Sequence, residues 1–447
     1  MRIDILTPGY LPTTGGGIAT FYRHLLPRLA AAGHEVRVFQ GSGRSAAAAS
    51  SPHIIDGVRT ECLDVARFKR HASRFAFLSA MPGLQRQLAG AWALAEQARE
   101  SGEADIIEAC DWGLLFIPPI LSGTTPVVAQ MHGSIGQIDS HDPMAGEETQ
   151  GVLIRLIESA VLRRATAIQC SSQANAAFWR RQTGASVETL APAWRAISDT
   201  GACEATSRGL VLGRVQKWKG PDILCRALTL LGGQSPAIDW VGPDTAAGVP
   251  GTSLSAELAL NFPDIWGARI NHLPPVSPER AASLQCAARF NVVPSTWDVF
   301  NFTCVEAMSS GRPVICSSGA GASELIEDGV NGFLFESGNP ASLAAALERT
   351  LLLNQTQQTE IGTAARETVR RMLDPERIAA QRLAAYQAAI AAFVPQAPMP
   401  SDWLAEACMG RDQSVANLSF LDHLPLRRIL SYGGRRLTEK LVRRAPG

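Results

Sequence analysis

Two carboxylates and two cations stand out because each pair follows a short apolar run of the kind that forms a buried strand. Asp298 and Glu306 lie eight positions apart, and Arg214 and Lys219 follow a second apolar run upstream. Carboxylates accept hydrogen bonds from hydroxyl groups, and fixed cations stabilise the charge of a phosphate. The four side chains therefore have the chemistry to hold a phosphorylated, hydroxyl-rich ligand such as a sugar nucleotide.

The elements that must position the two acids are predicted from apolar runs and helix breakers. The pattern predicts a buried strand, a loop, a helix and a second strand at residues 290–294, 295–301, 303–310 and 312–317. The loop ends at a helix N-terminus, where free backbone N–H groups and the helix dipole receive anions. A diphosphate is therefore expected at the residues that open this helix, which are Phe300, Asn301, Phe302 and Thr303.

Residues 289–335 resemble the donor-binding signature of the family 4 retaining glycosyltransferases, in which Pro-Ser precedes two acids separated by seven residues. The matching positions are Pro294, Ser295, Phe300, Glu306, Ala307, Met308, Gly311, Pro313, Val314, Glu324, Gly329, Asn331 and Gly332. The resemblance implies that the first acid faces the donor sugar and that Glu306 binds the ribose. This chain departs from the pattern with Asp298 in place of the first Glu.

Asn301 replaces the usual glycine of that loop. Its side chain either adds a hydrogen bond to the sugar or phosphate, or serves a backbone angle that asparagine tolerates better than most residues. Both interpretations stay open at this point.

The upstream cations lie between a predicted strand at 209–213 and a helix that begins near Pro221. The segment resembles the family's loop of Gly-Arg followed by Lys-Gly, and the resemblance implies that Arg214 and Lys219 grip the diphosphate. Two cations there would stabilise the negative charge that builds on the leaving nucleotide. The alternative is a pair of solvated surface charges. The presence of both motifs in one chain favours the binding role.

The amino-terminal half begins with a doubly wound unit: a strand at 3–7, a glycine-rich loop, a helix at 18–32 and a strand at 34–40. Gly16 and Gly17 let the backbone approach a ligand at the helix start. The loop resembles the family's GG loop, which implies a place near the donor phosphate and the acceptor. It lacks the G-x-G-x-x-G spacing, and Gln40 stands where a dinucleotide site needs an acid, so a nicotinamide dehydrogenase is disfavoured.

His132 follows a predicted strand at 126–130, at the strand end where open α/β sheets carry their ligands. The resemblance implies that this histidine lies beside the transferred sugar, and the alternative is a structural histidine. Glu108 lies in another predicted strand, at 105–110, and Asp111 follows it, close to where the resemblance places the acceptor. For these two acids a capping or surface role is the favoured interpretation.

The chain has 447 residues, of which 46% are hydrophobic, enough to bury two cores. The predicted parts are an acceptor-side Rossmann-like domain (1–195), a nucleotide-sugar domain (205–375), a helix that crosses back (376–395) and an extension (396–447). The interval 190–206 is the predicted linker. The resemblance implies the GT-B architecture, in which two doubly wound α/β domains face each other across a cleft.

Forty-one acids balance 41 bases, so the net charge indicates no nucleic-acid partner. Nine cysteines without zinc-type spacing predict reduced thiols and no metal site. Neither a signal peptide nor a long apolar run is present, so a cytoplasmic protein is expected. The basic end of the chain, 427–447, would suit a helix on the inner membrane surface, whereas Gly433 and Gly434 favour a broken, solvated tail.

The resemblance implies a retaining, metal-independent hexosyltransferase that needs no cofactor. It would move a sugar from a UDP- or GDP-sugar to a hydroxyl of a saccharide or lipid-linked acceptor, in the synthesis of cell-surface polysaccharide or glycolipid. Two alternatives remain, a GT-B epimerase of nucleotide sugars and a catalytically inactive relative that only binds them. An epimerase would consume donor without any acceptor.

Overall fold

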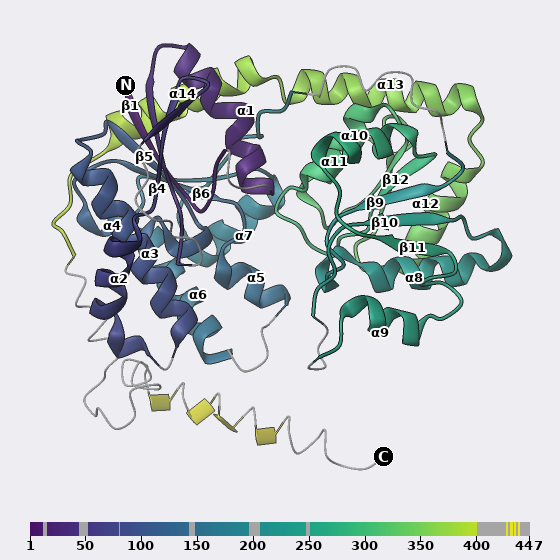
Figure 1. The fold of residues 1–447 in the computed structure, drawn as a ribbon, viewed down its shortest axis with the longest axis horizontal. Helices are drawn as coiled ribbons and strands as arrows, with labels where there is room; N and C mark the ends of the chain where they lie inside the picture. Colours follow the sequence, from purple (N-terminus) through teal and green to yellow (C-terminus); the bar gives the residue numbers. More distant parts are fainter. Residues whose placement is uncertain are drawn as a thin grey trace.

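The computed structural model describes residues 1–11, 16–43, 52–79, 81–142, 148–195, 206–246 and 251–399, with 426–427, 430–431, 433–434 and 437–438 of the tail. Two α/β domains lie side by side, each built on a largely parallel sheet with helices on both faces (Figure 1). This arrangement confirms the predicted fold class of two facing Rossmann-like domains.

The first sheet has the strand order β3-β4-β2-β1-β5-β6-β7-β8, and only the β3–β4 pair is antiparallel. The chain adds strands first on one side of β1 and then on the other, which is the doubly wound topology. This topology brings the carboxyl ends of the parallel strands to one edge of the sheet. The strands are β1 (Arg2–Thr7), β2 (Glu35–Gln40), β3 (His53–Ile55), β4 (Val58–Cys62), β5 (Ile106–Cys110), β6 (Val127–Met131), β7 (Ala167–Cys170) and β8 (Glu188–Thr189).

The helices of the first domain cover both faces of this sheet. They are α1 (Gly17–Ala31), α2 (Val65–Arg74), α3 (Pro82–Glu100), α4 (Ile117–Ser122), α5 (Ile135–His141), α6 (Glu148–Leu162) and α7 (Gln173–Thr183). The segment 155–165, which in sequence resembles the family's long helix, belongs to α6 as far as Leu162, and this helix begins earlier, at Glu148.

The second sheet has the order β11-β10-β9-β12-β13-β14, and all of its strand pairs are parallel. The strands are β9 (Gly209–Leu212), β10 (Ile238–Val241), β11 (Ile270–Leu273), β12 (Phe290–Val293), β13 (Val314–Ser317) and β14 (Phe333–Phe335). The helices are α8 (Pro221–Leu231), α9 (Leu254–Asn261), α10 (Pro278–Ala287), α11 (Phe302–Ser310), α12 (Pro340–Leu351), α13 (Gln355–Met372) and α14 (Pro375–Ala392).

Helix α14 follows the second domain in sequence but packs against the first. It lies along α1 and reaches β6, and Ile378, Ala379 and Tyr386 join the hydrophobic core on that face of the first sheet (Figure 1). The second domain is thus connected to the first through both the linker and this helix. The domain boundaries given above remain a prediction, and residues 196–205 of the linker lie outside the described part of the chain.

No helix in the described part of the chain is both long enough and apolar enough to cross a membrane. Most of the basic tail lies outside the described residues. The described positions of the tail are helical and exposed, Gly433 and Gly434 among them.

Candidate active site

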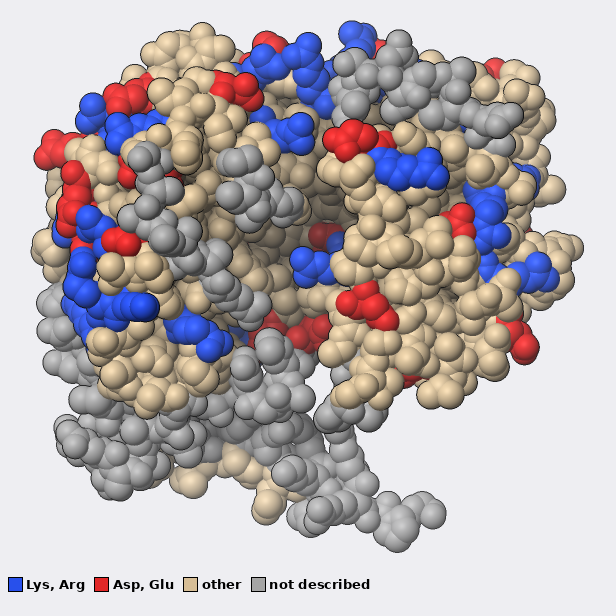
Figure 2. Space-filling model, in the orientation of Figure 1, with Lys and Arg blue, Asp and Glu red and all other residues tan. Residues whose placement is uncertain are grey.

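A cavity of about 1060 Å³ lies between the two domains, and Figure 2 shows the hollow between them with acidic and basic side chains at its rim. The residues predicted to form the site all line it: Gly16, Gly17, His132, Arg214, Lys219, Asp298, Phe300, Asn301, Phe302, Thr303 and Glu306. They follow the carboxyl ends of β1, β6, β9 and β12. The two sheets therefore bring together residues that are separated by up to almost three hundred positions in the chain.

Lys219 and Asp298 form an ion pair, with Nζ 2.5 Å from Oδ2. The same carboxylate oxygen accepts a hydrogen bond from Asn301 Nδ2 at 2.8 Å. The two loops that carry the pair are joined by their backbones, because Thr296 N–H donates to the carbonyl of Trp218 at 2.8 Å. An ammonium group has three donors, so Lys219 can keep Asp298 and still contact an anion. Lys219 and Asp298 thus reach the cavity as one unit.

Asn301 serves the backbone of α11 as well as Asp298. Its φ of +84° places it in the left-handed region, and its Oδ1 caps the helix by accepting from Cys304 N–H at 3.1 Å. Glycine and asparagine are the residues that adopt this backbone conformation most readily, which is why asparagine can replace the family's glycine. Its amide group is engaged within the protein, so the backbone interpretation of Asn301 accounts for its contacts.

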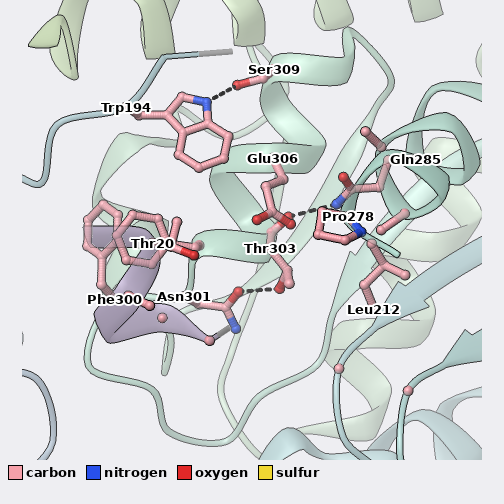
Figure 3. A pocket seen from close by; sticks show the side chains of 18 of the residues that line it. Thr20, Trp194, Leu212, Pro278, Gln285, Phe300, Asn301, Thr303, Glu306 and Ser309 are labelled. Carbon is pink, nitrogen blue, oxygen red and sulfur yellow. Dashed lines mark hydrogen bonds between the residues drawn. The ribbon is translucent and has the colours of Figure 1, made fainter. Parts of the chain in front are cut away.

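Glu306 extends from α11 into the cavity. Figure 3 shows it between Trp194 on one side and Gln285 on the other. Burial raises the pKa of its carboxyl to about 7. Among the described residues its side chain has no ion-pair partner, so the carboxyl remains free to accept hydrogen bonds from the hydroxyl groups of a ligand.

Arg214 follows β9 directly after Gly213 and lines the cavity. It is exposed and has no ion-pair partner among the described residues, unlike Lys219. Unpaired guanidinium groups are well suited to phosphate oxygens, which they can contact with two N–H groups at once. The wall of the second domain therefore presents one free cation and one paired cation beside the N-terminus of α11.

His132 lies on the opposite wall, at the end of β6. Its ring makes edge-to-face contacts with Phe21 and Tyr22 of α1, at centroid distances of 4.6 and 5.5 Å. Burial, together with the positive charge of Arg382, lowers the pKa of His132 to about 3. The ring is therefore neutral at physiological pH, and its Nε2 has no hydrogen-bond partner among the described residues.

Gly16 and Gly17 open α1 at the same wall. Gly16 has a φ of +110°, a conformation that glycine adopts without strain. A Cβ built on Gly17 would lie 3.7 Å from Cδ2 of Phe302, so the two domains approach each other closely at this point. The amino end of α1 and the amino end of α11 thus face the same cavity.

The interpretation of Glu108 as a surface or capping residue is wrong. Glu108 is fully buried and pairs with Arg382, because α14 covers the face of the sheet from which it projects. Asp111 is a backbone cap, although it is buried and not at the surface. It accepts from the N–H groups of Trp112, His132 and Gly133 at 2.8 to 3.0 Å, and this fixes the turn that carries His132.

Trp194 and Gln285 are cavity residues that the motifs do not indicate. Trp194 Nε1 donates to Ser309 Oγ at 2.9 Å, and Gln285 Nε2 donates to the carbonyl of Thr303 at 3.2 Å (Figure 3). Trp194 comes from the linker and Gln285 from α10, where neither spacing nor periodicity marks them. Their contacts with α11 exist only once the helices have packed.

Two family models match the chain. The Glycosyl transferase 4-like domain matches residues 16–194, and Glycosyl transferases group 1 matches residues 207–352. Together they cover both walls of the cavity.

The chain is also similar to curated proteins named D-inositol 3-phosphate glycosyltransferase. The protein from a Nocardioides species is 27% identical over 417 residues, 85% of this chain and 87% of that protein. The Nocardiopsis dassonvillei protein is 28% identical over 271 residues, 56% of this chain and 60% of its own length. The Geodermatophilus obscurus protein is 33% identical over 150 residues, 32% of each chain. For the last two, the match spans less than two thirds of the relative.

Solved structures share the fold. Sucrose-phosphate synthase from Thermosynechococcus elongatus has a TM-score of 0.66 at 21% identity, over 88% of this chain and 99% of the other. HepE from Anabaena, in complex with UDP and glucose, has a TM-score of 0.59 at 18% identity, over 87% of this chain and all of the other. Matches to both domains, relatives of the same kind and the shared two-domain fold lead to one conclusion: this chain belongs to the family 4 glycosyltransferases of the GT-B fold.

Proposed function

We propose that this protein is a retaining glycosyltransferase that moves a sugar from a nucleoside diphosphate sugar to an acceptor hydroxyl without a metal ion. One observation supports it most: Arg214, Lys219 and the N-terminus of α11 lie on one wall of a single cavity with Glu306, opposite His132. Cations and helix N–H groups suit a diphosphate, and a carboxyl suits a ribose diol. The donor therefore spans the cavity from Glu306 to Asp298 and His132.

In this proposal the bond between the anomeric carbon and the diphosphate breaks while the acceptor oxygen bonds to the same carbon. The acceptor proton passes to a donor phosphate oxygen, so no covalent sugar–enzyme intermediate is required. Arg214, Lys219 and the amide groups of Phe302 and Thr303 stabilise the departing diphosphate. Asp298, whose Oδ2 already accepts from Lys219 and Asn301, binds the sugar as a hydrogen-bond acceptor.

UDP is the donor nucleotide to test first, because the structural neighbour HepE is seen with UDP and glucose. The curated relatives are named for an inositol phosphate, which makes a sugar phosphate the first acceptor to test. A saccharide or lipid-linked acceptor for cell-surface polysaccharide or glycolipid synthesis is the other acceptor class. Leu426, Leu430 and Leu437 are exposed on the tail, as a peripheral membrane contact in the cytoplasm would require.

The first experiment is a thermal-shift panel of the purified protein with UDP, GDP, ADP and their sugar conjugates. A ligand that binds only the folded state raises its unfolding temperature. We expect one nucleotide to stabilise the wild type and to lose this effect in Glu306→Ala and Lys219→Ala. Lys217→Ala is the matched control, since Lys217 is exposed and does not line the main cavity.

The second experiment follows donor consumption with and without acceptors, using inositol 3-phosphate, oligosaccharides and a membrane lipid extract. Donor loss that requires an acceptor supports transfer. Conversion of the donor to its epimer without an acceptor would establish the epimerase instead. Nucleotide binding with no donor loss under any condition would identify an inactive relative, and the absence of any nucleotide-induced shift would contradict the assigned site.

A further inference from the structure

A row of polar side chains crosses the otherwise apolar face of the first sheet that α1 and α14 cover. In the strand register Glu108 pairs with Val128, and Gln130 pairs with Gln169. Since alternate residues of a strand share a face, Gln130 and His132 lie on the same face as Val128, which belongs to the core beneath α1 and α14. The row ends with His132 at the cavity.

Arg382 of α14 reaches this row, and its side chain is fully buried. The Nη1 group donates to Gln130 Oε1 at 2.7 Å, to Gln169 Oε1, and to Glu108 Oε2 at 3.4 Å. Tyr386, one turn further along α14, donates to the same Glu108 oxygen at 2.5 Å. A fully buried charge is costly without partners, and here they lie on the Nη1 side of the guanidinium, since Nε and Nη2 have no hydrogen-bond partner among the described residues.

The guanidinium group of Arg382 also lies over the ring of Phe21, with Cζ 5.4 Å from the centroid. The same ring makes edge-to-face contacts with Tyr22 and with His132, at centroid distances of 5.0 and 4.6 Å. A continuous set of contacts therefore runs from Arg382 through Phe21 to His132. It connects α14, which follows the second domain in sequence and lies along α1 in Figure 1, to the wall of the first domain that lines the cavity.

We propose that Arg382 is a positioning residue for the reaction: from α14 it holds Phe21 and thereby fixes the ring of His132 in the wall beside the donor sugar. The inference rests on the proposed function for its catalytic consequence, but the placement of His132 can be measured without any substrate. Docking of α14 would then be a condition for a complete site and not merely a contribution to stability.

The groups around His132 come from every element packed near it. Tyr22 is contributed by α1, Glu108 and Asp111 by β5 and its following turn, and Arg382 with Tyr386 by α14. Asp298 and Lys219 line the cavity from the second domain. Arg382 is the cation whose charge acts on His132, so its removal favours protonation of the ring.

The test is NMR of protein with isotope-labelled histidine, recorded without substrate, in which the spectrum of His132→Gln assigns the His132 signals. Ring currents of Phe21 and Tyr22 displace these signals in the wild type. We expect Arg382→Met to move them away from their wild-type positions and to raise the pH at which they titrate. Signals of His34 and His53, which lie outside the cavity lining, should not change.

In assays with donor and acceptor, Arg382→Met should lower kcat by about tenfold while the KM for the donor stays within about twofold of the wild-type value.

Tyr386→Phe is the matched control, because it removes a hydrogen bond to Glu108 but keeps the cation over Phe21; it should leave the His132 signals in place. Arg382→Lys keeps the charge and should restore part of the wild-type spectrum. If Arg382→Met does not fold, Arg382→Met with Glu108→Gln removes both buried charges and has the same readout. His132 signals that coincide with the wild type in position and titration would overturn the proposal, whether or not the protein transfers sugar.

Discussion

At the scale of single residues, the charged side chains that line the cavity differ in their burial and in whether they form an ion pair. Lys219 is paired with Asp298, whereas among the described residues neither the exposed Arg214 nor the partly buried Glu306 has an ion-pair partner. In the proposed function, Arg214, which contacts the diphosphate, is exposed, and Glu306, which accepts hydrogen bonds from hydroxyl groups, is partly buried. The protonation state of Glu306 should therefore control donor binding near neutral pH.

The affinity for UDP-glucose should fall as the pH is lowered from about 8 to about 6. The folded protein holds Glu306 with its pKa raised to about 7, so the carboxyl gains a proton in this range and loses acceptor capacity. UDP-glucose is the appropriate probe because its diphosphate diester does not titrate there. Calorimetric titration should show a loss of roughly tenfold.

Glu306→Gln is the control for this prediction, since it cannot ionise. It should bind more weakly than the wild type at about pH 8 and show little dependence on pH. Equal pH dependence in the two proteins would assign the titrating group elsewhere.

At the scale of elements, short helices are held by side chains at their ends. Asn301 caps α11 from a left-handed conformation, and Ser134 caps α5 while it donates to Glu158 of α6. For the first cap, the resemblance indicated only that Asn301 stands where the family has glycine, and the capping role of its side chain was not predicted. Nothing in the sequence indicated the second, because Glu158 meets Ser134 only when α6 packs against α5.

Asn301→Ala should destabilise the protein by about 2 kcal/mol, because it removes the cap and places a Cβ at positive φ. Asn301→Gly also lacks the cap and the bond to Asp298, but adopts this φ without strain, so it should be about 1 kcal/mol more stable than the alanine variant. Denaturant unfolding of the two proteins measures the difference. Equal stabilities would show that the left-handed conformation costs alanine nothing here.

Glu158→Gln should change how stability depends on pH. Burial raises the pKa of Glu158 to about 8, well above its value in an unfolded chain. Above about pH 4.5 the unfolded chain releases this proton, whereas the folded protein holds it up to about pH 8. The free energy of unfolding therefore declines as the pH rises from about 4.5 to about 8, by up to about 1.4 kcal/mol per pH unit. The thermal midpoint of the wild type should fall more than that of the variant between about pH 6 and pH 8. Parallel curves would contradict an elevated pKa at this site.

At the scale of the whole molecule, a few contacts hold the domains on either side of the cavity. Glu324 of the second domain accepts from the N–H groups of Gln173 and Ala174 at the start of α7, both at 3.0 Å. Ser172 Oγ donates to the carbonyl of Val299 at 2.7 Å, and His141 stacks on Trp297 at 4.1 Å. These contacts join the two domains beside the cleft.

Glu324→Ala should favour a more open arrangement, because it removes an anion from the positive end of α7. We expect a larger radius of gyration by solution scattering without ligand, and a return toward the wild-type value when nucleotide is bound. Glu327→Ala is the matched control, since Glu327 is also exposed but its side chain makes no contact with the first domain among the described residues. Identical scattering from both variants would show that Glu324 does not hold the domains together.

Much of this architecture follows from local patterns. The strands β1, β9 and β12 end within a residue or two of the predicted positions, because apolar runs followed by glycine or proline mark buried parallel strands. The start of α6 was missed by seven residues, because Gly151 is a weak helix former and the first turns of the helix depend on core packing, in which Leu153 and Ile154 take part. Glu108 was misassigned because its partner is Arg382, far along the chain.

The sequence by itself determined the chemistry of the site: which acids, cations and glycines follow the strands, and that parallel strands bring them to one edge. It could do so because these signals are local and depend on residue type. Only the tertiary structure decided which residues meet. It paired Lys219 with Asp298, brought Trp194 and Gln285 against α11, and placed Arg382 behind His132. Such contacts join residues far apart in the chain, and they follow from domain and helix packing that no local pattern encodes.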